Sequence, residues 1–198
     1  MMAVNLRKIE GNWHLGYALD KHMLSSTFTG HNEYGHPTFD NKRTDVGEAV
    51  YQLKYRQDWA QAARLARGIV THIVPLLADK IGLVVPMPAS TVRDRQPVTE
   101  VAQEVAKLLQ VNVFTNLLIK NNVPNANQSL KNLGSKEEKV AALAGRFRLE
   151  DVIAGKEQWN ALVIDDLFDS GASMEAACSL LKSYAKIDKV FVAALTWK

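Results

Sequence analysis

A short apolar run that ends in two carboxylates constrains the fold of this chain more than any other stretch. Residues 161–164 read Ala-Leu-Val-Ile without a polar residue, so both faces of this segment should be buried, as in a strand of a parallel sheet. Asp165 and Asp166 follow directly, and the small, polar stretch Asp-Ser-Gly-Ala-Ser occupies 169–173. From Met174 onward, apolar residues recur at helical spacing. The pattern predicts a strand, an acidic pair, a small-residue loop and a helix.

This order of elements is suited to binding a phosphorylated sugar. Ligands of open α/β sheets bind outside the carboxyl ends of the strands. The free N–H groups at the start of a helix attract a phosphate when a glycine such as Gly171 allows close approach. Carboxylates beside such a pocket accept hydrogen bonds from ribose hydroxyls or hold a hard cation through water. The alternative is an ordinary strand–turn–helix in which Asp169 or Ser170 caps the helix.

The stretch 161–173 resembles the phosphoribosyl pyrophosphate (PRPP) motif of type I phosphoribosyltransferases. That motif has four apolar residues, two acidic and two variable ones, then Thr/Asp, Thr/Ser, Gly, any residue and Thr/Ser. Serine replaces threonine at two positions here. The resemblance implies that the acidic pair holds the ribose hydroxyls and that the loop after it binds the 5′-phosphate. The residues that would bind PRPP are Asp165, Asp166, Asp169, Ser170, Gly171, Ala172 and Ser173.

The same resemblance implies a reaction, a cofactor and a catalytic residue. In the enzymes that carry this motif, Mg²⁺-bound PRPP loses pyrophosphate while a nitrogen nucleophile attacks the ribose. The implied partners are therefore PRPP and a small-molecule acceptor, and the implied cofactor is Mg²⁺ at Asp165 and Asp166, held directly or through water. Asp169 stands where 6-oxopurine enzymes have a carboxylate that manages the proton of the base, so it is the candidate catalytic residue and favours a purine-like acceptor. A helix N-cap is the other interpretation of Asp169.

Residues 81–90 predict a second buried strand that ends in a rigid loop. Pro86 and Pro88 remove backbone donors, so we expect both to lie outside the central ladder. Arg93 and Arg95 follow and suit either a bound pyrophosphate or a solvated surface turn. The resemblance makes this stretch the pyrophosphate loop. Its predicted residues are Met87, Pro88, Ala89 and Ser90.

From about residue 46 to residue 196, the chain is similar to the competence protein F branch of the phosphoribosyltransferases. The similarity rests on Leu53-Lys54-Tyr55, on the strand end before Ser90, on Gln128 ahead of a basic helix, and on Phe147. It implies a mobile loop between Lys120 and Lys139, for which a solvated helix face is the alternative interpretation.

The chain also departs from that branch. Arg95-Gln-Pro-Val-Thr replaces the usual Arg-Gly-Phe-Asn-Gln, and Lys139 and Ala142 stand where an arginine and an asparagine are expected. Cys178 is the single cysteine, so the zinc ribbon that often begins these proteins cannot form, and a buried, inert thiol is expected.

Apolar runs that alternate with amphipathic helices predict an α/β fold with a mostly parallel sheet flanked by helices. The resemblance implies that this fold is of the type I phosphoribosyltransferase kind. Residues 1–43 are rich in Gly, His, Asn and aromatic residues and predict a small antiparallel flap, so the expected units are 1–43 and 44–198. His31, His36 and Asp40 in the flap suggest either a metal cluster or ordinary hydrogen bonds. The predicted helices cover residues 45–55, 59–78, 97–109 and 128–144, and the last predicted strand covers 190–195.

Composition narrows the function classes. The net charge of +3, from 24 basic and 21 acidic residues, does not indicate a nucleic-acid partner. The sequence has neither an apolar leader nor a membrane-length apolar run, so we expect a cytoplasmic protein with no membrane partner; a homo-oligomer is compatible with it. Trp197 is placed either to stack on a base or to pack against the protein itself.

Two alternative functions stay open: a non-catalytic PRPP or nucleotide sensor linked to DNA uptake or gene regulation, and a sugar-phosphate-binding α/β module with unrelated chemistry.

Overall fold

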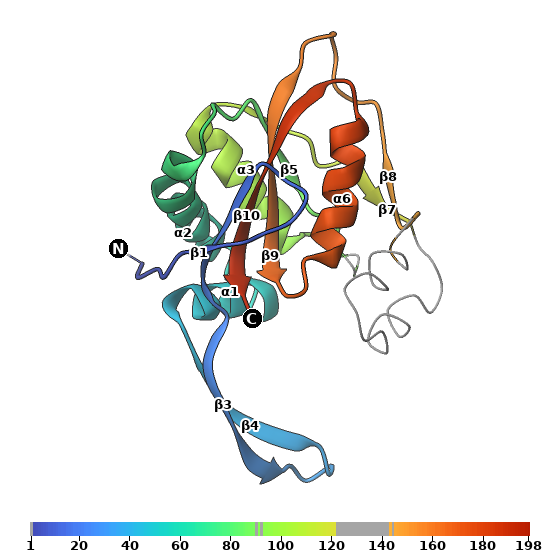
Figure 1. Ribbon diagram of the computed structural model, residues 1–198. Helices are drawn as coiled ribbons and strands as arrows, with labels where there is room; N and C mark the ends of the chain where they lie inside the picture. Colours follow the sequence, from blue (N-terminus) through green and yellow to red (C-terminus); the bar gives the residue numbers. More distant parts are fainter. Residues whose placement is uncertain (1, 90, 92, 122–142, 144) are drawn as a thin grey trace.

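The main body of the protein is a six-stranded, mostly parallel sheet (Figure 1). The computed structural model describes residues 2–89, 91, 93–121, 143 and 145–198. Every neighbouring pair of strands in this sheet is parallel except β1 and β2. The strands in spatial order are β1 (Arg7–Lys8), β2 (Leu15–Lys21), β10 (Ile187–Trp197), β9 (Trp159–Phe168), β5 (Leu83–Pro86) and β6 (Asn112–Val113).

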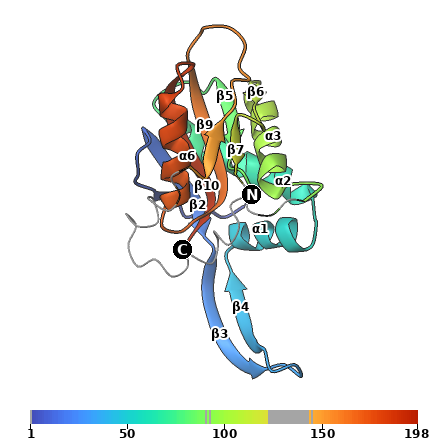
Figure 2. The ribbon, with the colours of Figure 1, turned by 90° about the vertical axis from the view of Figure 1, so that its right-hand side faces the viewer.

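Helices cover both faces of this sheet (Figure 2). One face carries α1 (Asp45–Tyr55), α2 (Ala60–Gly68) and α3 (Pro97–Leu109), and the other carries α6 (Ala172–Ser183). Alternate residues of the central strands enter the two cores: Leu162 and Ile164 pack with α1–α3, whereas Ala161 and Val163 pack with α6. The predicted α/β class with a mostly parallel, helix-flanked sheet is therefore confirmed, and the continuous apolar runs reflect strands buried on both faces.

Local signals define the helix ends. The N–H of Gly47 donates to Thr44 Oγ1 at 2.9 Å, so the predicted threonine cap begins α1. Pro97 occupies the first turn of α3, as predicted. The helix expected over 59–78 is less regular: α2 passes into a π-turn at Ile69–Ile73 and a 3₁₀ turn at Val74–Leu76, where Pro75 prevents an α-helical continuation.

Pro86 corrects one expectation, because it is the last residue of β5 and not part of the following loop. It lies opposite Ile164 of β9, and the next residue, Met87, donates its N–H to the carbonyl of Ile164 at 2.8 Å. Backbone groups of alternate residues point to opposite sides of a strand. The missing N–H of Pro86 therefore points toward β6, whose pairing with β5 has already ended at Val84, and no ladder bond is lost.

Two small antiparallel sheets complete the fold. β3 (Met23–His31) and β4 (Pro37–Arg43) form a hairpin that projects from the body (Figures 1 and 2), and this hairpin is the predicted flap. β1 and β2, although they precede it, pair within the main sheet, and the division into units 1–43 and 44–198 stays a prediction. β7 (Leu118–Lys120) pairs with β8 (Phe147–Leu149). Several predicted features lie outside the described residues. They are the helix over 128–144 (apart from residue 143), the loop from 122 to Lys139, Gln128, Ala142 and Ser90.

Candidate functional site

The acidic pair lies inside β9 and not beyond its end. The four apolar residues before it are fully buried, as expected, but β9 continues to Phe168 because β10 pairs with it as far as Trp197. Asp165 and Asp166 are therefore held in extended backbone with neighbouring strands beside them, and both are partly buried. Successive side chains of a strand point to opposite faces, so the two carboxylates diverge from one another.

A glycine makes the turn from β9 into α6. Gly171 adopts φ +78°, and a Cβ placed on it would lie 2.9 Å from the ring of Phe168, so both backbone and space favour glycine there. α6 begins at Ala172, with Gly171 as its N-cap residue and without a side-chain hydrogen bond from that cap. The first N–H groups of a helix have no partner within the helix, and those of α6 start at this turn.

Asp169 does not cap α6, so that interpretation is wrong. Its side chain is 66% exposed, and its Oδ2 lies 3.8 Å from the Nζ of Lys198. The weak local contact at the helix start comes instead from Ser170, whose Oγ accepts from the N–H of Ala172 at 3.5 Å. Asp169 is thus left with its carboxylate directed to solvent and to the C-terminal lysine.

Two cavities meet at the end of β9. The larger, of about 350 Å³, is bounded by α1, the loop after β5 and the start of α3; the smaller, of about 190 Å³, lies along the turn into α6. Asp165 and Ser173 line both cavities, and Asp166 lines the larger one. The larger cavity also includes Met87, Pro88 and Ala89 of the predicted pyrophosphate loop. The smaller one includes Asp169, Ser170, Gly171 and Ala172.

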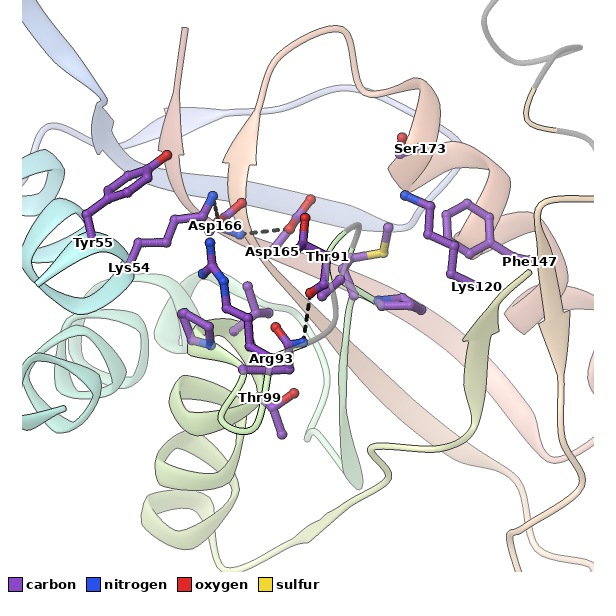
Figure 3. A pocket seen from close by; sticks show the side chains of 16 residues that line it. Lys54, Tyr55, Thr91, Arg93, Thr99, Lys120, Phe147, Asp165, Asp166 and Ser173 are labelled. Carbon is purple, nitrogen blue, oxygen red and sulfur yellow. Dashed lines mark hydrogen bonds and ion pairs between the residues drawn. The ribbon is translucent and has the colours of Figure 1, made fainter. Parts of the chain in front are cut away.

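Lys54 is a site residue that sequence reasoning did not assign a role. It stands near the end of α1, and its Nζ forms an ion pair with Asp166 Oδ2 at the wall of the larger cavity (Figure 3). The side chains of Lys54 and Asp166 keep 29% and 17% of their exposure, so this pair is accessible from the cavity. The only signal in the sequence was the position of Lys54 in the stretch Leu53-Lys54-Tyr55, which does not identify its partner.

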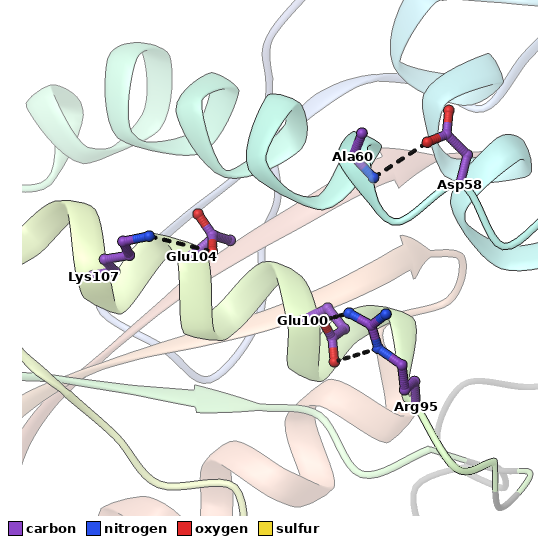
Figure 4. A network of polar contacts seen from close by, with 6 residues as sticks. All are labelled: Asp58, Ala60, Arg95, Glu100, Glu104 and Lys107. Atoms are coloured by element: carbon purple, nitrogen blue, oxygen red, sulfur yellow. Dashed lines mark hydrogen bonds and ion pairs between the residues drawn. The ribbon is translucent and has the colours of Figure 1, made fainter.

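The two arginines of the loop after β5 have different environments. Arg95 Nε donates to Glu100 Oε1 at 3.2 Å (Figure 4). The guanidinium of Arg95 lies 4.1 Å from the ring centroid of Trp59. Arg93 lines the larger cavity and points toward Lys54 and Asp166 (Figure 3). Arg93 is thus available to a ligand, whereas Arg95 joins the start of α3 to the start of α2.

The surroundings of the cavity alter the pKa of Asp165. Burial, and then the charge of Asp166, raise the pKa of Asp165 to about 7. A hydrogen bond from the Asp166 N–H at 2.8 Å and the charges of Lys54 and Lys120 oppose this rise. Burial, and then Arg146, lower the pKa of Lys120. Because Lys54, Arg93 and Lys120 face two carboxylates of which one is partly protonated near neutral pH, the larger cavity favours a polyanion.

The acidic pair fits a magnesium ion only in a particular way. Mg²⁺ retains several waters and is usually bound through one or two carboxylates together with substrate phosphates. In the part of the chain that the structure describes, no three His, Cys, Asp or Glu side chains gather into a group that could hold a metal ion. Asp165 and Asp166 therefore suit an ion that arrives on a phosphorylated ligand, and they do not form a cage of protein ligands.

Trp197, considered for base stacking, and His31, considered for metal binding, both contact side chains of the protein. The guanidinium of Arg7 lies 4.4 Å from the ring centroid of Trp197, and the ring belongs to the packed edge beside β2. In the hairpin, His31 packs against Phe28 with ring centroids 5.2 Å apart.

Within the described residues, no helix has the length and apolar character that crossing a bilayer requires.

No protein-family model and no curated protein sequence matches this chain. Solved structures that resemble it include adenine phosphoribosyltransferase of Trypanosoma brucei (14% identity over 98% of this chain and 75% of that one, TM-score 0.49). Hypoxanthine phosphoribosyltransferase of Staphylococcus aureus is 12% identical over 71% of this chain, with a TM-score of 0.41, and UMP synthase of Leishmania donovani is 13% identical over 85%, with a TM-score of 0.39. This chain spans 65% of the former and 28% of the latter. Similarities of this extent leave the substrate undecided.

Proposed function

We propose that this chain is a phosphoribosyltransferase of the type I kind that binds PRPP and transfers its phosphoribosyl group to a nitrogenous acceptor. The observation that carries the proposal is the position of Asp165, which lies between a cation-lined cavity and a second cavity at the start of α6. PRPP has the matching layout, because its ribose hydroxyls stand between a 5′-phosphate and a pyrophosphate.

Each part of PRPP has a chemically suitable partner in this layout. The 5′-phosphate would occupy the smaller cavity, where the N–H groups and hydroxyls of residues 170–173 supply donors. The pyrophosphate would lie in the larger cavity with Lys54, Arg93 and Lys120, near the backbone of residues 87–89. The ribose hydroxyls would donate to Asp165 and Asp166, since a carboxylate already paired with an ammonium still has free lone pairs.

The residues would act mainly by positioning and by charge. Departure of pyrophosphate from the anomeric carbon develops negative charge on the leaving group, and the three cations of the larger cavity would stabilise it. Mg²⁺, held through water by Asp165 and Asp166, would supply further positive charge to the pyrophosphate. Asp169, at the solvent side of the smaller cavity, is our proposed acceptor of the proton released by a purine-like base.

Calorimetry on the full chain with PRPP and Mg²⁺ tests the proposal first. Saturable binding at one site per chain supports it, whereas an absence of binding also removes the sensor alternative and leaves the sugar-phosphate module. Release of pyrophosphate across a panel of purine and pyrimidine bases then separates a transferase from a sensor that only binds PRPP or a nucleotide. Binding without release for every base would favour a sensor with a role in DNA uptake or gene regulation.

A further inference from the structure

A third cavity lies at the end of α2, on a different part of the molecule from the candidate site. Its volume is about 430 Å³, and it shares no lining residue with the two cavities at the end of β9. The N-terminal segment runs beside α2 here, as Figure 1 shows. The lining residues are Met2, Arg64, Arg67, Gly68, Thr71 and His72.

The side chains that line this cavity lie on one face of the helical segment. Arg64, Arg67, Gly68, Thr71 and His72 stand at positions i, i+3, i+4, i+7 and i+8, which is the spacing of one helix face. This face continues from α2 into the π-turn of Ile69–Ile73, so Thr71 and His72 line the same cavity as Arg64 and Arg67. Such turns occur frequently at functional sites.

Gly68 allows the opposite wall to form. A Cβ at this position would lie 2.7 Å from the Cε of Met2, so a side chain there would make the end of the Met2 side chain move away from the helix. The Met2 side chain is buried and supplies an apolar wall beside the two arginines. The cavity therefore combines cationic donors with an apolar surface.

The charge of this cavity is not neutralised from within. Among the described residues, the lining contains no acidic side chain, and no carboxylate forms an ion pair with Arg64 or Arg67. Arg64 Nη1 donates only a long hydrogen bond, 3.4 Å, to Gln61 Oε1. The contrast is with three arginines that do pair with glutamates, which are Arg43, Arg95 and Arg148.

We propose that the cavity at the end of α2 binds a diphosphate group, either free or as part of a nucleoside diphosphate. Two guanidinium groups offer paired N–H donors to phosphate oxygens, and the Thr71 hydroxyl and the His72 imidazole add two further donors. Met2 provides the surface against which an attached nucleoside would pack. This site is independent of the proposed transferase site, because the two share neither residues nor an element that carries their donors.

The test uses the His72 side chain as a local reporter in the full chain. Its imidazole proton–carbon NMR signal is assigned with the His72→Gln variant and followed while inorganic pyrophosphate, and separately ADP, is added. We expect a saturable shift with pyrophosphate. The affinity obtained from this shift should fall at least about tenfold when Arg64→Gln is combined with Arg67→Gln. Tighter binding of ADP identifies a nucleoside diphosphate as the ligand, and equal binding identifies the diphosphate alone.

Two controls make the result specific. Arg56→Gln combined with Lys156→Gln removes the same charge from exposed positions outside the cavity lining and should leave the shift unchanged. Asp165→Asn combined with Asp166→Asn should also leave it unchanged, even if PRPP binding is lost. The proposal is overturned if the shift of the His72 signal does not saturate in the millimolar range of pyrophosphate. It is also overturned if the affinity falls equally in the Arg64/Arg67 variant and in the Arg56/Lys156 control.

Discussion

The two cavities that meet at Asp165 are built in different ways. The smaller one is local: a single stretch, from Asp165 to Met174, supplies every described residue of its lining. The larger one is assembled from segments far apart in the sequence, including Lys54 of α1, Arg93 after β5 and Lys120 of β7. The smaller cavity therefore depends on backbone conformation, whereas the larger depends on side-chain charge held in place by the packing of several elements.

This difference predicts two separable kinds of damage. Ribose 5-phosphate is a probe for the smaller cavity, and inorganic pyrophosphate is a probe for the larger one. Changes at Asp165 and Asp166 should weaken binding of the PRPP ribose, which would lie between the two cavities.

Loss of both carboxylates should affect the whole ligand. Asp165→Asn combined with Asp166→Asn removes the acceptors for the ribose hydroxyls and the water-mediated hold on Mg²⁺, so we expect PRPP affinity to fall at least about 100-fold by calorimetry. Asp40→Asn combined with Asp188→Asn, at exposed positions outside both cavities, is the control. Unchanged PRPP affinity in the first variant would count against the roles assigned to the acidic pair.

Gly171→Ala should damage the smaller cavity alone. It combines a strained positive φ with a contact of 2.9 Å to the Phe168 ring, so we expect a loss of roughly 1–3 kcal/mol in the free energy of unfolding and about tenfold weaker ribose 5-phosphate binding. Gly35→Ala is a matched control, because Gly35 has φ +76° with nothing within 4 Å. Equal losses of sugar-phosphate binding in both variants would show that the turn into α6 is not the phosphate site.

Removal of cavity cations should damage the larger cavity alone. Lys54→Gln combined with Arg93→Gln is expected to weaken pyrophosphate binding about tenfold and to leave ribose 5-phosphate binding within about twofold. Arg95→Gln is the control, since Arg95 contacts Glu100 and Trp59 and its replacement should lower stability only slightly without changing pyrophosphate affinity. If Arg95→Gln weakened pyrophosphate binding as much, the distinction between the two arginines would be wrong.

The smallest effect concerns pH. Asp165 has an ordinary pKa of 3.8 when unfolded and about 7 in the folded chain, so the folded state retains its proton longer than the unfolded state. Its contribution to stability is present at low pH and is lost as the pH rises from about 4 through about 7. Asp165→Asn should remove this dependence and so narrow the stability difference between the two ends of that window, measured by denaturant unfolding. If the stability of the variant changed with pH in the same way as that of the unchanged chain, the pH dependence would belong to groups other than Asp165.

Local parts of the fold were predictable because their signals are local. The cap at Thr44 and the proline at Pro97 define helix starts within a few residues, and both predicted helices have the observed bounds. The apolar run 161–164 indicated a strand buried on both faces, which it is. The residues of the turn into α6 come together for the same reason, since they are neighbours in the sequence.

Long-range features were not predictable from one sequence. The end of β9 depends on where β10 stops pairing with it, so the strand extends beyond the acidic pair to Phe168. The partner of Lys54 depends on how α1 packs against the sheet, and the different environments of Arg93 and Arg95 depend on whether Trp59 is near. Periodicity and spacing carry no information about such contacts.

The pairing of β2 with β10 has a practical consequence for shortened versions of the protein. β2 covers one long side of β10, a strand in which the residues from 190 to 196 are all buried. A polypeptide that starts at residue 44 would lack β2 and would leave this row of backbone donors and acceptors without a neighbour. An uncovered apolar edge of this length recruits strands from other molecules, so such a fragment should self-associate and precipitate where the full chain does not.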